Sequence, residues 1–121
     1  TKDVLGYGQH GSTFGGNPVC AAGACSIISR IDDELLCSVK EKSEYIKRFL
    51  SGVKGVKSVS GLGLMLGIET EKSAKDIVNN CIEKGVLVLT AKTKIRLLPA
   101  LNIPMEQLQK AMNILKEVIE E

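Results

Sequence analysis

The chain has 121 residues, close to the usual size of one domain and long enough to bury a single core. Its 16 Lys and Arg nearly balance its 14 Asp and Glu, and the two signs are interspersed along the chain, which argues against a nucleic-acid-binding surface. No signal-peptide pattern and no apolar run long enough to span a bilayer is visible, so we expect a cytoplasmic protein that makes no membrane contact.

The four cysteines predict neither a disulfide framework nor a metal site. None of them forms a CxxC pair, and the chain has one histidine, His10. Cys20, Cys25 and Cys81 lie among apolar neighbours, where a reduced cysteine acts as a small apolar side chain. We therefore expect reduced thiols and no metal.

The chain begins with a glycine-rich segment that favours a loop over residues 1–17. Glycine loses more backbone entropy than any other residue on entering regular structure, and five glycines precede Asn17. Asn17 and Pro18 then suit the N-cap and first position of a helix. From Val19 to Ile28, small residues dominate on every side of this helix, a pattern typical of a buried helix.

A second helix is predicted from Asp32 and Asp33 onward, with apolar residues at three- and four-residue spacing, and ends near Gly52. The following segment, 56–69, predicts two strands or one bent strand. Its glycines fall on one face and its leucines and isoleucine on the other, the latter being Leu62, Leu64, Leu66 and Ile68. A glycine face predicts that another backbone or a ligand approaches closely.

The remaining pattern predicts a helix over 74–84 capped by Ser73, with Ile77, Val78, Cys81 and Ile82 directed inward. Strands follow over 86–89 and 94–98, and Pro104 opens a last helix. This order predicts an α+β fold, in which helices pack on one face of a small, mainly antiparallel sheet.

One candidate binding site is the loop over residues 8–18. Its glycines allow backbone N–H groups to turn toward an anion, Ser12 and Thr13 supply hydroxyl donors, and a helix N-terminus follows. These features are typical of a phosphate site, although the Walker pattern is absent. The residues alone leave a second interpretation open, in which the segment is a plain glycine-rich connection.

A second candidate is Arg96, which alternates with Ile95 and Leu97 in a predicted strand. The guanidinium is a planar, permanently charged fork that binds a carboxylate through two parallel hydrogen bonds. The pattern alone favours the other interpretation, an arginine on the solvent face of the strand.

The stretch from His10 to Pro18 resembles the signature loop of the class III, fold-type I aminotransferases, and the resemblance extends over essentially the whole chain. Two further stretches, 60–69 and 95–101, are more similar to the acetylornithine branch than to the ornithine or 4-aminobutyrate branches. Ala100 departs from the pattern, since the family commonly has a second proline there; this affects loop stiffness more than chemistry.

This resemblance implies a homodimeric enzyme that depends on pyridoxal 5'-phosphate and belongs to arginine biosynthesis. It implies that Thr13, with Ser12 beside it, binds the phosphate of the cofactor held by the neighbouring subunit. It further implies that Arg96 binds the substrate α-carboxylate, and that the amino group passes from N2-acetylornithine to 2-oxoglutarate.

The resemblance places the Schiff-base lysine and the aspartate that pairs with the cofactor ring upstream of the Gly-Ser-Thr-Phe sequence. The chain begins Thr1-Lys2-Asp3 without Met, and Lys2 lacks a matching context. We therefore expect a C-terminal part of such an enzyme, with a cofactor-phosphate loop over 1–17, the small domain over 18–121, no catalytic residue of its own and no activity alone. The alternatives are a stand-alone α+β ligand-binding or regulatory module, or a succinylornithine or ornithine aminotransferase.

Overall fold

The computed structural model describes residue 4 and residues 6–121, and the chain divides into two compact units, 1–32 and 33–121. The first unit holds the glycine-rich loop and helix α1 (Pro18–Ile28), and the second holds all the other helices and strands. The division falls after Asp32, whereas the sequence suggested one after Asn17. The two boundaries differ by helix α1, which has no buried residue and belongs to the same unit as the loop.

Helix α1 begins where the sequence predicted. The Asn17 side-chain oxygen accepts hydrogen bonds from the backbone amides of Val19 (2.9 Å) and Cys20 (3.2 Å), and Pro18 occupies the first helical position. The expectation that this helix is buried is wrong for the structure described, since Val19 is 78% exposed and Ile28 67%. Small residues on every side permit close packing, but the described residues of the first unit form no sheet or second helix to supply it.

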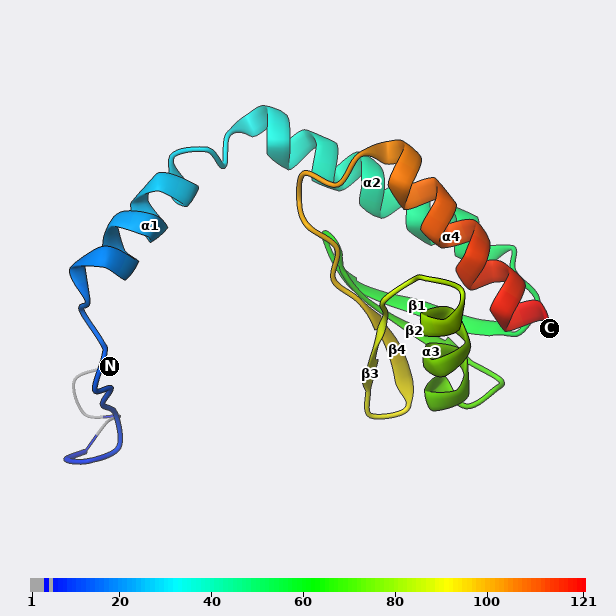
Figure 1. Ribbon diagram of the computed structural model, residues 1–121, viewed down its shortest axis with the longest axis horizontal. Helices are drawn as coiled ribbons and strands as arrows, with labels where there is room; N and C mark the ends of the chain where they lie inside the picture. The colour runs from blue at the N-terminus through cyan, green and yellow to red at the C-terminus, as the bar shows by residue number, and fades with distance from the viewer. Residues whose placement is uncertain (1–3, 5) are drawn as a thin grey trace. The chain divides into compact units, whose positions relative to one another are not determined.

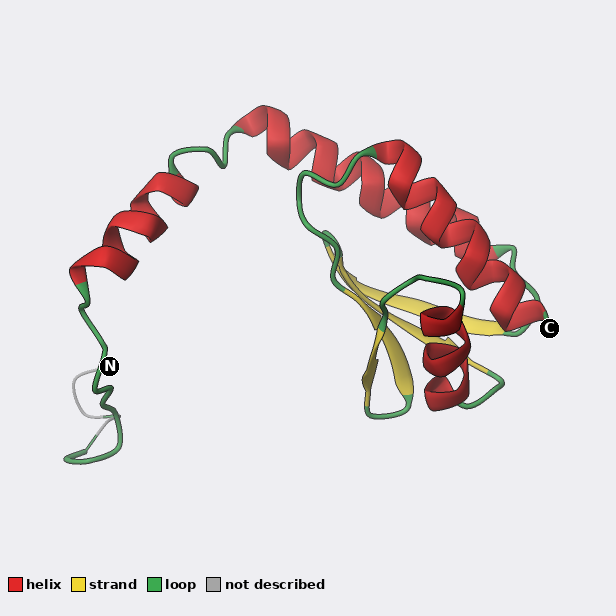
Figure 2. Ribbon diagram, in the orientation of Figure 1, coloured by secondary structure: helices red, strands yellow, loops and turns green. Residues whose placement is uncertain are grey.

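The second unit has the predicted α+β architecture (Figures 1 and 2). Its four strands form one antiparallel sheet in the order β1-β2-β4-β3. The elements in chain order are α2 (Asp33–Ser51), β1 (Val56–Leu62), β2 (Met65–Thr70), α3 (Ala74–Glu83), β3 (Leu89–Ala91), β4 (Lys94–Leu97) and α4 (Met105–Glu120). Among the described residues, no helix is both long enough and apolar enough to cross a membrane.

The core lies between one face of this sheet and helices α2, α3 and α4. Strands β2 and β4 bury alternate residues, in agreement with the two-residue period of a strand that has one covered face. The largest fully buried side chains are aliphatic and come from both layers: Ile46, Leu50, Leu66, Ile68, Ile77, Ile95, Leu108, Leu115, Val118 and Ile119. The residues between the buried ones, among them Gly67 and Arg96, belong to the opposite face, which no helix of this unit covers.

Two local predictions were wrong. Strand β3 begins at Leu89 rather than Val86, because the Val86 amide donates to the Cys81 carbonyl (2.8 Å) and so belongs to the end of helix α3. Ile82 was expected to point inward, yet it is 48% exposed. It follows the fully buried Cys81 by one residue, and one residue turns a helix by about 100°, away from the core.

A lysine joins the end of helix α3 to helix α4. Lys84 donates hydrogen bonds to the carboxylates of Glu117 (2.8 Å) and Glu121, and these two bonds raise the pKa of Lys84 above its usual value. Since the ammonium is largely in solvent, this link orients the two helix ends and adds little to stability.

Residues 56–70 form two strands in a hairpin, so the sequence alternative of one bent strand is excluded. Leu62 pairs with Met65 across the turn made by Gly63 and Leu64. The turn interrupts the alternation, so Leu62 is 89% exposed and does not share the buried face of Leu66 as predicted. Gly61 has φ +130°, and a Cβ there would lie 2.1 Å from the Met65 carbonyl oxygen, which confirms the expected close backbone approach.

We predict that Gly61→Ala destabilises the second unit by about 2 kcal/mol or more, because alanine must adopt an unfavourable φ or push the Met65 carbonyl away. The measurement is the urea midpoint of unfolding. Gly52→Ala is the matched control, since a Cβ at Gly52 meets nothing within 4 Å. Its expected change is within about 0.5 kcal/mol. Equal midpoints for the two variants would contradict the constraint on Gly61.

Candidate functional site

The first candidate site is the glycine-rich loop of the first unit. Residues 13–16 form a turn that ends at Gly16 (φ +75°), and the Asn17 amide donates to the Phe14 carbonyl (3.2 Å). Ser12 and Thr13 are adjacent and exposed just before this turn. Within the described part of the chain, neither hydroxyl has a hydrogen-bond partner. Two neighbouring hydroxyls are therefore free to meet a ligand.

The N-terminus of helix α1 contributes less to this loop than the sequence suggested. Pro18 has no N–H, the amides of Val19 and Cys20 donate to the Asn17 side chain, and the Ala21 amide donates to the Asn17 carbonyl (2.9 Å). The amides of the first turn already have acceptors, so an anion would not find them free. Anion binding by this segment would rest on the hydroxyls of Ser12 and Thr13 and on loop amides. His10 is an exposed loop residue, as the sequence indicated.

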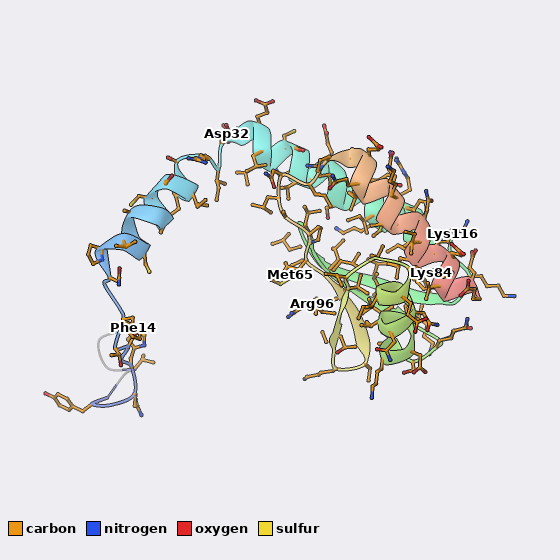
Figure 3. All side chains as sticks on the ribbon, in the orientation of Figure 1. Phe14, Asp32, Met65, Lys84, Arg96 and Lys116 are labelled. Carbon is orange, nitrogen blue, oxygen red and sulfur yellow. The ribbon has the colours of Figure 1, made fainter. Side chains whose placement is uncertain are left out.

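The second candidate site is Arg96, on strand β4 of the second unit. In the sheet register it lies between Gly67 of strand β2 and Leu89 of strand β3. Figure 3 shows Arg96 and Met65 projecting from the sheet on the side away from Lys84. The side chain is half-buried, and its Nε is enclosed without a hydrogen-bond partner among the described residues.

An enclosed, unpaired guanidinium N–H differs from a solvated surface arginine. Buried polar groups in folded proteins nearly always have a partner, and leaving one without costs about 1–3 kcal/mol, or more for a charged group. A ligand oxygen would satisfy the Arg96 Nε, and a carboxylate could do so through two parallel bonds. Both interpretations of Arg96 from the sequence stay predictions, and the unpaired Nε makes the residue a candidate for ligand binding.

The charges beside Arg96 are already paired with each other. The carboxylate of Glu69 lies 3.6 Å from the Lys94 ammonium and accepts a hydrogen bond from the Ser58 hydroxyl (3.2 Å). The ammonium of Lys94 also lies 3.4 Å from the Ser60 hydroxyl. The sequence analysis did not identify this group, because its members come from three strands whose register cannot be read from the sequence. The alternation of buried and more exposed residues along β2 and β4 was the signal that could have indicated it.

Apolar side chains share the open face with Arg96. Met65, Leu89 and Leu98 are each more than half exposed there or at its edge. A cavity of about 490 Å³ adjoins this region between the end of helix α3, strand β4 and helix α4. Its lining includes Arg96, Leu89, Leu98 and Pro99. Apolar neighbours lower the local dielectric constant and so favour the binding of an anion by an arginine.

Cys81, the cysteine in the core of the second unit, is not a reactive nucleophile. Cys81 is fully buried, and burial raises the pKa of its thiol, so the thiol stays protonated near neutral pH. Cys20 and Cys25 are exposed, although the sequence placed them among apolar residues as buried groups; Cys37 is exposed too. Residue 4 and residues 6–121 contain no group of three His, Cys, Asp or Glu side chains that could hold a metal ion.

The chain matches known proteins over nearly its whole length. The family model described as aminotransferase class-III matches residues 2–119. An acetylornithine aminotransferase of Haemophilus ducreyi is 43% identical over 98% of this chain, and one of Clostridium acetobutylicum is 37% identical over 93% of it. Each alignment covers 31% of the relative, so the chain spans about a third of the length of these curated relatives.

Solved structures agree with the fold. An acetylornithine aminotransferase of Elizabethkingia anophelis is similar over 98% of this chain and 34% of its own, with a TM-score of 0.77 and 29% identity. An ornithine delta-aminotransferase of Plasmodium falciparum is similar over 96% of this chain and 33% of its own, with a TM-score of 0.76 and 30% identity. The sequence match and the shared small antiparallel sheet with its helices lead to one conclusion: the chain belongs to the class III aminotransferases.

Proposed function

We propose that this chain is the C-terminal part of an acetylornithine aminotransferase, which transfers the amino group of N2-acetylornithine to 2-oxoglutarate. The observation that carries the proposal is the half-buried Arg96, whose Nε has no partner among the described residues on a sheet face that no helix of its unit covers. The names of the two curated relatives support the choice of donor. An ornithine aminotransferase is the second candidate, because one such structure has nearly the same TM-score.

In this proposal Arg96 binds the carboxylate next to the reacting carbon of 2-oxoglutarate. Because the α-amine of N2-acetylornithine is acetylated, that donor reacts at its free terminal amine, far from its own carboxylate, so this contact belongs to the half-reaction of 2-oxoglutarate. Two parallel hydrogen bonds fix the plane of the carboxylate and thereby the direction of the bond to be broken. The apolar side chains of Met65 and Leu89 limit water around this contact.

Ser12 and Thr13 fit the role of phosphate ligands for pyridoxal 5'-phosphate. Their hydroxyls are exposed, adjacent and unpaired in the described part of the chain, and hydroxyl donors beside glycines suit a phosphate. When bound, the cofactor ring would accept the electron pair released at the substrate carbon. By the family resemblance, the cofactor they contact belongs to the partner subunit of a homodimer, for which we propose a cytoplasmic location.

We predict that the 121-residue chain alone catalyses no transamination and does not attach the cofactor covalently, because the resemblance assigns the attaching lysine to a segment upstream of the loop. The test is borohydride reduction of the chain mixed with pyridoxal 5'-phosphate, followed by mass spectrometry. Modification of a single lysine together with amino transfer would overturn this proposal. Specific binding of another ligand without transamination by any longer form would favour a stand-alone binding module.

In the complete enzyme, Thr13→Ala is expected to weaken cofactor affinity by about ten- to a hundred-fold. A hydrogen bond to a charged group contributes roughly 1.5–3 kcal/mol, and 1.4 kcal/mol is a factor of ten. Equilibrium titration with pyridoxal 5'-phosphate measures the change, and mixed dimers locate it in the neighbouring subunit's site. Thr93→Ala, also an exposed threonine, is the control. Unchanged affinity in Thr13→Ala would remove the assignment.

Arg96→Lys is expected to lower kcat/KM for 2-oxoglutarate by about one to two decades. Lysine keeps the charge but loses the two-pronged geometry, at roughly 1.5–3 kcal/mol. Cofactor affinity should stay near the wild-type value, because the phosphate ligands come from the loop. Arg48→Lys, on helix α2, is the matched control and should change little. Near-wild-type kinetics with 2-oxoglutarate would contradict the substrate role of Arg96.

A further inference from the structure

We propose that Lys94 is a positioning residue for Arg96: by pairing with Glu69, it keeps that carboxylate from occupying the guanidinium and so leaves Arg96 open to a substrate carboxylate. This inference rests on the proposed role of Arg96. It assigns no substrate contact to Lys94 or Glu69.

The sheet register brings the three charged side chains onto one face. Gly67 pairs with Arg96 and Ile68 with Ile95, so the next residue of strand β2, Glu69, faces Lys94. Residues two apart on a strand share a face, which places Lys94 and Arg96 side by side on strand β4. Glu69 is therefore directly opposite Lys94 and diagonal to Arg96.

Glu69 is within reach of Arg96 as well as of Lys94. Diagonal neighbours on an antiparallel pair are about 7–8 Å apart, a separation that long side chains bridge. Gly67, directly opposite Arg96, has no side chain of its own, and the Lys94 stem lies in the space beside it. In the structure the carboxylate nevertheless turns to Lys94 (3.6 Å) and to the Ser58 hydroxyl (3.2 Å).

The Lys94 side chain is held in the position that this role requires. A Cβ built on Gly67 would lie 3.5 Å from the Lys94 Cδ, so the lysine stem lies beside Gly67 and toward strand β1. Its ammonium reaches the Ser60 hydroxyl on that strand (3.4 Å). The glycine therefore admits the lysine stem, and the ammonium draws Glu69 to the side of the sheet away from Arg96.

Without Lys94, the cation that strand β4 still offers to Glu69 is Arg96, its diagonal neighbour. An internal ion pair would then compete with the substrate carboxylate for the same guanidinium. If Glu69 occupies Arg96 for two-thirds to nine-tenths of the time, the apparent dissociation constant of a carboxylate rises about three- to tenfold. The turnover of bound substrate is unaffected, because the occupied enzyme has already displaced Glu69.

The test uses the complete enzyme and two readouts: the dissociation constant of glutarate by calorimetry, and KM and kcat for 2-oxoglutarate. Lys94→Met keeps the aliphatic stem beside Gly67 and removes the charge. Glu69→Gln removes the competitor, and the double variant Lys94→Met/Glu69→Gln removes both. Lys116→Met, an exposed lysine on helix α4, is the control for losing one positive charge (Figure 3). Urea midpoints verify that all variants fold.

The expected result is a three- to tenfold rise in the glutarate dissociation constant and in KM for Lys94→Met, with kcat within about twofold. The double variant and Lys116→Met should both bind glutarate within about twofold of wild type. A crystal structure of Lys94→Met should show Glu69 against Arg96. Unchanged binding in Lys94→Met overturns the inference, and so does a double variant that stays weak, since Lys94 would then contact the ligand itself.

Arg96→Lys separates this inference from the proposed function. If that variant binds glutarate as tightly as wild type, Arg96 is not the carboxylate site and both proposals are lost. If Arg96→Lys loses binding while Lys94→Met keeps it, the proposed function stands and the role of Lys94 is refuted.

Discussion

The second unit depends on the burial of one sheet face under three helices. Strands β2 and β4 place Leu66, Ile68, Ile95 and Leu97 toward the helices, and each is at most 4% exposed. Because strand side chains alternate, this burial forces Gly67, Glu69, Lys94 and Arg96 onto the other face. The aliphatic core thus decides where the charged residues lie, and a shift of one residue in the register would exchange the two sets.

The open face combines features that a purely solvated face would not need. Its guanidinium has an enclosed, unpaired Nε, its acid is held by a neighbouring lysine, and a glycine lies opposite the arginine. In the proposed role of Lys94, its pairing with Glu69 lowers the competition for Arg96 from within the protein. Since an unpaired buried donor destabilises a fold, a ligand that supplies the missing oxygen would recover that free energy on binding.

The first unit shows a different balance between composition and packing. Helix α1 is rich in Ala, Gly, Cys and Ile, yet none of its residues is buried, and its first-turn amides are satisfied by Asn17 alone. Local hydrogen bonds are therefore enough to define where the helix starts, while its apolar surface has no counterpart within the unit. In the proposed homodimer, the small side chains of α1 would suit close packing and the hydroxyls of Ser12 and Thr13 would face a partner's cofactor.

Local signals in the sequence determined the α+β class, the start of helix α1 at Asn17-Pro18, the span of helix α2, the position of strand β4 and the loop character of Ser12 and Thr13. Each depends on capping, glycine content or periodicity over a few residues. Only the tertiary structure decided that Leu62 and Ile82 are exposed, that Val86 belongs to a helix end, and that Lys94 and Glu69 pair beside Arg96. Those outcomes depend on strand register and on which surfaces meet, and contacts between residues far apart in the chain leave no local pattern.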